Sequence, residues 1–258
     1  MTETDEKMPF TLHLEELKKR LIRVLIAVGV GFGVCYLFKE KLFWALTLPL
    51  AAVLPDNSSM IFTSLPEAFF TYLKVSFLGA LFLVSPYILY QIWKFVSPGL
   101  FESEKKHVAP FVIFSTIFFL GGSLFAYYIV FPFGFKFFVG FGNDFIRPML
   151  SLREYLSFSM KLLIAFGIIF ELPIFMFFLG RIGVVSSEVL RKKRKYAILL
   201  VFITAAIFTP PDVVTQGLMA LPLMLLYEIS VWVVRAGEKK RAPEEESEEN
   251  DTEAEKNE

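Results

Sequence analysis

The sequence predicts an all-α membrane protein whose chain crosses the bilayer six times. Three observations support this fold class. Apolar residues make up 55% of the 258 residues and aromatic residues 17%, with 31 Phe, which is too apolar for an ordinary soluble domain. Several apolar stretches have the length of a bilayer-crossing helix. The single cysteine, Cys35, lies inside one of these stretches, which excludes a disulfide within the chain.

Each of the six predicted spans has a local reason for its limits. The first is followed by charged residues and no small-residue cleavage site, so we interpret it as a retained span and not a signal peptide. Pro86, Pro173 and Pro222 lie inside the second, fourth and sixth spans, where proline bends a membrane helix, and Pro132 follows the third. The predicted spans are residues 21–38, 75–93, 108–130, 156–180, 196–208 and 213–234.

The last two spans are expected to be short. Residues 196–208 amount to roughly 20 Å of helix, against about 30 Å of hydrocarbon. The sixth span is uncharged only over residues 213–227, and Gln216 makes its outer end polar. The connector "TPPD", which ends at Asp212, predicts a tight turn. This hairpin therefore either thins the bilayer locally or leaves a polar notch; the alternative is that flanking side chains snorkel to the interface.

The distribution of Lys and Arg predicts that both termini are cytoplasmic. Nineteen of the 26 Lys and Arg residues fall on the side of the termini. We divide the chain into a cytoplasmic amphipathic segment (1–20), a six-span membrane domain (21–237) and an acidic tail (238–258). The tail is charged and free of aromatic residues, so we predict that it is disordered. The long outer loops, 39–74 and 131–155, are expected to cap the outer face.

Enzyme and cofactor signatures are missing from the sequence. It contains no H-E-x-x-H, no G-x-S-x-G and no P-loop, and no set of metal ligands can be assembled. The glycines of "GVGFG", residues 29–33, lie inside the first span without a preceding strand, which predicts close helix packing and not dinucleotide binding. We therefore predict a protein that is not an enzyme and needs no cofactor.

Two carboxylates lie at unusual positions in the spans. Glu171 is the only charged residue of the apolar run 162–180, and a mid-span acid costs about 3 kcal/mol on insertion scales. We expect it to face a partner or a wet cavity; a hydrogen bond that fastens the bundle is the alternative. Glu228 lies near the cytoplasmic end of the sixth span, where both interpretations stay open. A proton-coupled secondary transporter that uses Glu171 is the rival function, although no internal repeat supports it.

Acidic residues also lie in two cytoplasmic segments. Glu16 belongs to the amphipathic "LHLEELKKRL" before the first span, and Glu104 belongs to "WKFVSPGLFESEKK" between the second and third spans, close to Phe95. A carboxylate beside aromatic rings at a membrane surface suits a guanidinium group. Acidic residues beside lysines are more often a solvated surface, and physical arguments alone favour that interpretation.

The same segments carry a resemblance to a known family. The motifs that carry it are "HLEELKKRL" from His13, "SPYILYQIWKFVSPGLFESEK" from Ser85, "FAYYIVFPFGFKF" from Phe125, "YLSFSMKLLIAFGIIFELP" from Tyr155, "LRKKRKYAIL" from Leu190 and "TPPDVVTQGLMALPLMLLYEIS" from Thr209. Through these motifs the chain, from residue 10 to about residue 235, resembles TatC, the multispanning receptor subunit of the twin-arginine protein translocase.

The resemblance implies a glove-like, concave bundle in the bacterial inner membrane that acts as a receptor. Its cytoplasmic segments would bind the twin-arginine motif of signal peptides on folded precursors, with Glu16 and Glu104 as the acidic partners and Phe95 and Pro98 shaping the loop. Glu171 would lie on the concave face. The short fifth and sixth spans would contact single-span TatA/TatB-type subunits in an oligomeric complex driven by the proton-motive force, without nucleic acid. Further candidate contacts are Gln216, Asp212, Glu228 and Pro49.

Overall fold

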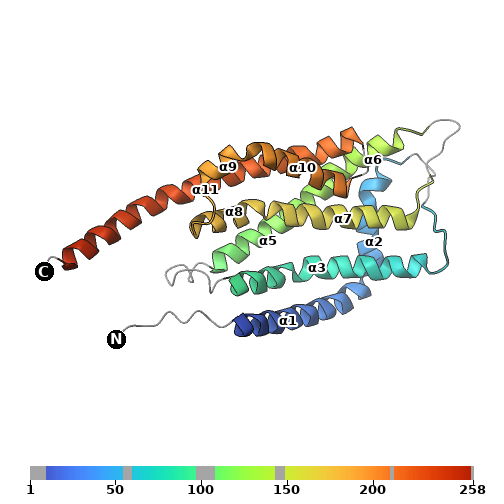
Figure 1. The fold of residues 1–258 in the computed structure, drawn as a ribbon. Coiled ribbons are helices and arrows are strands. Elements are labelled where there is room, and N and C mark those ends of the chain that lie inside the picture. The colour runs from blue at the N-terminus through green and yellow to red at the C-terminus, as the bar shows by residue number, and fades with distance from the viewer. Residues whose placement is uncertain (1–9, 55–59, 97–107, 143–148, 210–211, 257–258) are drawn as a thin grey trace. The chain divides into compact units, whose positions relative to one another are not determined.

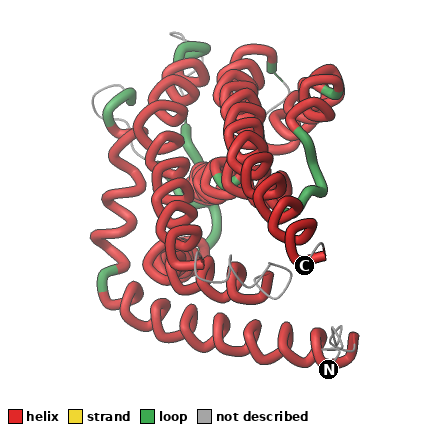
Figure 2. The backbone as a smooth tube through the Cα atoms, turned by 90° about the vertical axis from the view of Figure 1, so that its left-hand side faces the viewer, coloured by secondary structure: helices red, strands yellow, loops and turns green. Residues whose placement is uncertain are grey.

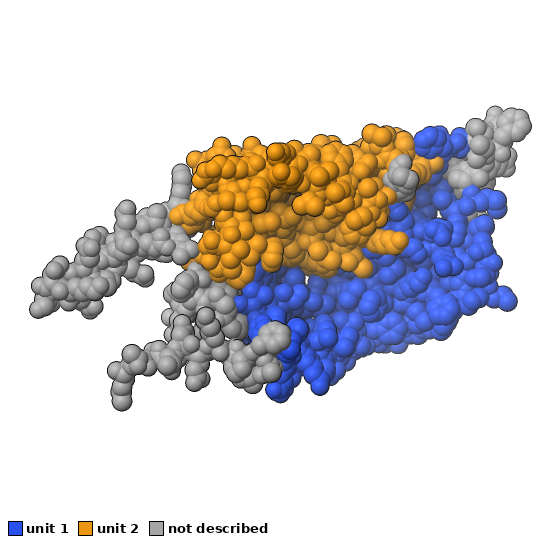
Figure 3. Space-filling view, viewed as in Figure 1, with its two compact units in different colours: residues 1–117, 139–160 blue, residues 118–138, 161–258 orange. Residues whose placement is uncertain are grey.

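The structure, a computed structural model, describes residues 10–54, 60–96, 108–142, 149–209 and 212–256. Two compact units divide the chain (Figure 3): unit 1 holds residues 1–117 and 139–160, and unit 2 holds residues 118–138 and 161–258. In chain order (Figure 1) the helices are α1 (Phe10–Leu37), α2 (Lys39–Ala51), α3 (Glu67–Val96), α5 (Val108–Phe125), the π-helix η2 (Ala126–Val130), α6 (Phe131–Val139), α7 (Leu152–Phe170), α8 (Leu172–Arg181), α9 (Ser187–Lys192), α10 (Arg194–Phe208) and α11 (Val213–Lys256).

The all-α class predicted from composition is confirmed. Helices dominate the described residues (Figure 2), and the only β contact among them is an isolated bridge between Ile61 and Ser151. Five helical stretches of this described part are long and apolar enough to cross a membrane. They are His13–Leu37, Glu67–Val96, Ala109–Val139, Leu152–Arg181 and Val213–Glu238.

The fifth predicted span is α10, and the expectation that it is short is confirmed. It has 15 residues, or roughly 22 Å of helix at 1.5 Å per residue. The following helix differs from the prediction, because the candidate span in α11 runs for 26 residues, from Val213 to Glu238. Apolar residues continue past Glu228, and Arg194 pairs with that carboxylate at 2.7 Å, so a charge near the interface does not end the helix.

In unit 1, α1 packs along α3 through a small-residue contact. A Cβ atom at Gly31 would lie 2.7 Å from Val84 Cγ2, so only glycine allows this approach. Gly29 and Gly33 have open space at the same position. The close packing predicted for "GVGFG" is therefore confirmed at Gly31 and does not extend to its two neighbours.

The outer segments of unit 1 are more ordered than the predicted loops. Residues 39–51 form α2, which leaves α1 at a steep angle (Figure 1), so Pro49 lies inside a helix and not in a loop. Ile61 and Ser151 form a parallel bridge in which Ile61 N–H donates to Leu150 O at 3.0 Å. The Tyr155 hydroxyl donates to Leu46 O at 2.5 Å, which ties α7 to α2.

Two spans also exceed their predicted limits. The second begins at Glu67 instead of residue 75, because the sequence "SLPE" starts the helix eight residues before the apolar run does. The third continues to Val139 through the π-helix η2, in which Phe131 N–H bonds to Ala126 O. Pro132 lacks the N–H that would bond to the carbonyl four residues earlier, and the wider π turn accommodates it, so proline does not end this span.

In unit 2, α5 and α7 cross at a pair of glycines. A Cβ atom at Gly122 would lie 2.5 Å from Phe166 O, and one at Gly167 would lie 2.7 Å from the Phe119 ring. Between them the Ser123 hydroxyl is 3.0 Å from Leu163 O, a hydrogen bond from α5 to α7. Small residues and interhelical hydrogen bonds are the usual means of close packing in membrane helices.

The backbone of α11 extends into the acidic tail, to Lys256. The predicted disorder of residues 238–258 stays a prediction. Glu, Ala and Lys, which occur in this segment, are good helix formers, so its composition is compatible with extension of an existing helix.

Candidate functional site

The carboxylate of Glu16 is held in a polar contact between α1 and α3. Arg20 Nε donates to Glu16 Oε1 at 3.0 Å, and a second nitrogen of the same guanidinium contacts that oxygen. A third nitrogen of Arg20 donates to Gln91 Oε1 on α3 at 3.3 Å. The Arg20 side chain is 9% exposed and that of Glu16 is 29% exposed. Arg20 therefore fixes the orientation of Glu16 and links it to α3.

The neighbouring acid, Glu15, is in a different environment. It pairs with Lys19 at 2.8 Å, four residues along the same helix, and 56% of its side chain is exposed. An exposed pair of this kind contributes little to stability. Of the two adjacent carboxylates, Glu16 is the one whose partner, Arg20, also bonds to another helix.

Phe95 lies at the same end of unit 1 as Glu16. Its ring stacks on His13 of α1, with ring centroids 4.3 Å apart. Two residues earlier, the Trp93 indole N–H donates to Ser115 Oγ at 2.7 Å, and the Trp93 ring stacks on Phe111 with ring centroids 4.9 Å apart. These contacts attach the last turn of α3 to both α1 and α5. Pro98 and Glu104, the other two predicted site residues, lie outside the described residues.

The predicted intramembrane acid, Glu171, lies at a break in the fourth span. α7 ends at Phe170 and α8 begins at Leu172. Glu171 N–H bonds to Ile168 O at 3.1 Å, a tightened turn, and Glu171 O accepts from Phe175 N–H at 2.9 Å. Pro173 falls in the first turn of α8, where a missing N–H costs nothing. The carboxylate is thus carried by an irregular turn between two helical segments.

The other predicted polar contacts are engaged within unit 2. Asp212 begins α11 as its cap: its side chain accepts from Thr215 N–H at 2.7 Å and from the Thr215 hydroxyl. Gln216 Nε2 donates to Phe202 O at 3.1 Å, which joins α11 to α10. Glu228 pairs with Arg194 at 2.7 Å. Gln216 and Glu228 therefore connect α10 to α11, whereas Asp212 caps α11 itself.

Sequence reasoning missed one buried carboxylate, Glu67 of unit 1. Its Oε2 accepts from Thr63 N–H at 2.7 Å, from the Thr63 hydroxyl at 3.1 Å and from Ser64 N–H at 3.3 Å. Its Oε1 accepts from Arg153 N–H at 2.9 Å, so it joins the start of α3 to the start of α7. The bond to Ser64 is half of a capping box, and the pattern "SLPE" in the sequence was the signal that could have identified it.

Comparison with known proteins identifies the family. The family described as "Sec-independent protein translocase protein (TatC)" matches residues 12–222. The chain belongs to the TatC family. A relative from Desulforapulum autotrophicum, named Sec-independent protein translocase protein TatC, is 57% identical over 251 residues, which cover 97% of this chain and 93% of the relative. The Escherichia coli (strain K12) protein of the same name is 38% identical over 231 residues, 90% of each chain.

A solved structure agrees with this assignment. The crystal structure described as "Twin Arginine Translocase Receptor- TatC" superposes with a TM-score of 0.78 at 41% sequence identity, over 87% of this chain and 99% of that chain. The predicted family, the helical membrane fold and a role in Sec-independent protein transport are therefore established. This TatC-family chain is a multi-pass membrane protein.

Proposed function

We propose that this protein is the signal-peptide receptor of a twin-arginine translocase. It binds twin-arginine signal peptides of folded precursors at its cytoplasmic face, through Glu16 and Glu104, with Phe95 and Pro98 shaping the loop. The observation that carries the proposal is the position of Glu16 and Phe95: residues from two helices lie at one end of unit 1, connected by Arg20–Gln91 and by His13–Phe95. The similarity to a solved twin-arginine translocase receptor supports the same assignment.

The Arg20 contact has a consequence for how Glu16 takes part. The buried Arg20 side chain donates to Glu16 Oε1 and so holds the carboxylate in one position. This position lies at the end of unit 1 where Phe95 belongs to the last turn of α3. A positioned carboxylate loses less side-chain entropy when a guanidinium binds than a mobile one does. The planar guanidinium also pairs with carboxylates in a fixed geometry that Lys cannot reproduce, which accounts for the requirement for arginine in the signal.

The remaining parts of the proposal concern the membrane and the partners. Both termini are cytoplasmic, as the Lys and Arg distribution predicts, and the protein resides in the bacterial inner membrane. Single-span TatA/TatB-type subunits assemble with it near Glu171, Gln216 and the α10–α11 hairpin, with Asp212, Glu228 and Pro49 as further candidate contacts. The complex uses the proton-motive force to export its cargo. The length of α10, 15 residues, supports this region as the place where the bilayer is perturbed.

Site-specific photocrosslinking tests the receptor function. A photoreactive residue at position 95, in membranes, is exposed to a precursor whose signal contains Arg-Arg and to a matched precursor with Lys-Lys. We expect crosslinks only to the Arg-Arg precursor, their loss in Glu16→Gln and Glu104→Ala, and their persistence in Glu15→Gln. Glu15 is the matched control because it is the adjacent acid on the same helix and its partner is the exposed Lys19.

Two results would overturn the proposal. Equal crosslinking of the Arg-Arg and Lys-Lys precursors would remove the argument for guanidinium recognition. Equal loss in Glu15→Gln and Glu16→Gln would reduce the site to general negative charge. Either result would direct attention to the rival function, in which Glu171→Gln abolishes proton-coupled transport of a small solute.

A further inference from the structure

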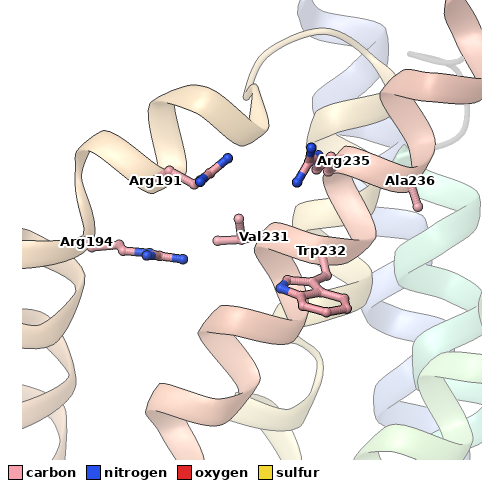
Figure 4. Close-up of a pocket in the computed structure, with 6 residues that line it drawn as sticks. All are labelled: Arg191, Arg194, Val231, Trp232, Arg235 and Ala236. Carbon is pink, nitrogen blue, oxygen red and sulfur yellow. The ribbon is translucent and has the colours of Figure 1, made fainter.

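Three arginines surround a hollow in unit 2 at the end where α8 ends and α9 begins. The hollow has a volume of about 490 Å³, and Arg191 of α9, Arg194 of α10 and Arg235 of α11 line it together with Val231, Trp232 and Ala236. In Figure 4 the side chains of Arg191 and Arg194 point toward α11, and Arg235 extends from α11 toward the same space. The hollow is therefore a strongly basic site built from three helices.

The arginines are carried by backbone that is fixed to α11. Leu190 is buried against Val231 and Val234, and the Tyr227 hydroxyl donates to Leu190 O at 2.6 Å. The Ser186 hydroxyl accepts from Val189 N–H at 3.3 Å and caps α9. Because the α9–α10 junction is held in this way, Arg191 and Arg194 face α11 as a consequence of packing and not of chance side-chain placement.

Nearby acids neutralise only part of this charge. Glu188 pairs with Lys192 at 2.6 Å, outside the hollow, and Glu228 pairs with Arg194 at 2.7 Å. The third acid, Glu238, accepts from Ser187 N–H at 2.8 Å and from its hydroxyl at 2.5 Å. Within the described part of the chain, Arg191 and Arg235 belong to none of the ion pairs. The hollow keeps positive charge that an anion can neutralise.

An apolar stripe on α11 leads to this basic hollow. Leu221, Leu225, Ile229 and Trp232 follow one another at spacings of four, four and three residues, so they lie on one face of the helix. Their exposed fractions are 63%, 65%, 46% and 76%. An exposed Trp between an apolar stripe and arginines is the arrangement found at the boundary between hydrocarbon and headgroups. The stripe and the hollow together match an amphiphile with an anionic head.

We propose that this hollow binds the headgroup of an anionic phospholipid, whose phosphodiester lies between Arg191, Arg194 and Arg235 and whose acyl chains run along the α11 stripe. Guanidinium groups pair with phosphate oxygens in a bidentate manner, and basic pockets at the ends of membrane helices suit acidic lipid headgroups. The site is separate from the proposed signal-peptide site on unit 1, and it does not depend on that function.

Lipid titration of the purified full-length protein in mild detergent, followed by native mass spectrometry, tests the proposal. The probes are phosphatidylglycerol, phosphatidylcholine with the same acyl chains, and inorganic phosphate as a competitor. The test variant is Arg191→Gln/Arg235→Gln. The matched control is Lys193→Gln/Lys195→Gln, which removes the same charge from the same unit but leaves the residues that line the hollow intact.

We expect phosphatidylglycerol to bind in preference to phosphatidylcholine. The arginine double variant should weaken phosphatidylglycerol binding about tenfold or more, because each basic side chain near an anionic headgroup contributes about 1 kcal/mol. The lysine variant should weaken it far less. All four residues are exposed, so these variants should keep the helical content of the parent by circular dichroism.

Three results would overturn the inference. Equal binding of the two lipids would show that the headgroup charge is not recognised. Equal losses in the arginine and lysine variants would reduce the effect to diffuse surface charge. Complete competition by inorganic phosphate would identify an anion site that does not need the apolar stripe.

Discussion

Substituting Gly122 with Ala should separate α5 from α7. The added Cβ would lie 2.5 Å from Phe166 O and 2.6 Å from Phe170 Cγ, whereas carbon–oxygen contacts between packed helices are about 3.3–3.6 Å. Relief requires a displacement of about 1 Å between the helices, or movement of a backbone carbonyl that is part of α7. A flexible side chain could yield to this methyl group, but the carbonyl oxygen cannot, and the carbonyl contact therefore dominates the cost.

The expected loss in free energy of unfolding is about 1–2 kcal/mol. Overpacking in a well-packed core costs about 1–3 kcal/mol. Replacing Gly by Ala within a helix returns up to about 1 kcal/mol through higher helix propensity. Separation of the helices also weakens the bond from the Ser123 hydroxyl to Leu163 O, now 3.0 Å long, which contributes about 0.6 kcal/mol by the average for membrane helices.

Gly121→Ala provides the matched control. Gly121 is the preceding residue of the same helix, and a Cβ atom there meets no atom within 4 Å. Unfolding of the purified protein in mixed micelles by increasing SDS, followed by circular dichroism, should show Gly122→Ala less stable than the parent and Gly121→Ala equally or more stable. Equal effects of the two substitutions would refute the argument from the glycine contact and leave helix propensity as the explanation.

Three further substitutions test single contacts. Tyr155→Phe should lower the free energy of unfolding by about 1–2 kcal/mol, because Leu46 O loses a buried donor; the exposed Tyr128→Phe should not lower it in the same SDS titration. Glu67→Gln should lower the midpoint of thermal unfolding more than Glu154→Gln does. All four groups bonded to the Glu67 carboxylate are donors, and an amide NH₂ cannot accept from them. Equal midpoints for the two variants would contradict this. Glu228→Gln should increase phosphatidylglycerol binding by the freed Arg194 in native mass spectrometry, and unchanged binding would exclude Arg194 from the lipid site.

The amino-acid sequence alone determined the helical membrane class of this protein and the short length of α10. These features depend on how many consecutive apolar residues the bilayer demands, which is a local property of composition. Limits of the helices were less predictable. Proline at position 132 was expected to end a span, but a single π turn absorbs it, and a capping box extends α3 beyond its apolar run.

The candidate sites divide in the same way. Antiparallel spans place Glu16 and Phe95 at one end of the chain's first unit, so their proximity follows from topology. Topology does not determine which of the two adjacent acids is held in position. Glu15 and Glu16 have similar sequence neighbours, and only the contact of Arg20 with Gln91, 71 residues away, distinguishes them. Arg191, Arg194 and Arg235 likewise looked like ordinary positive-inside charges. Only the tertiary structure brought them around one hollow, because the direction of a side chain depends on the packing of helices that are distant in the sequence.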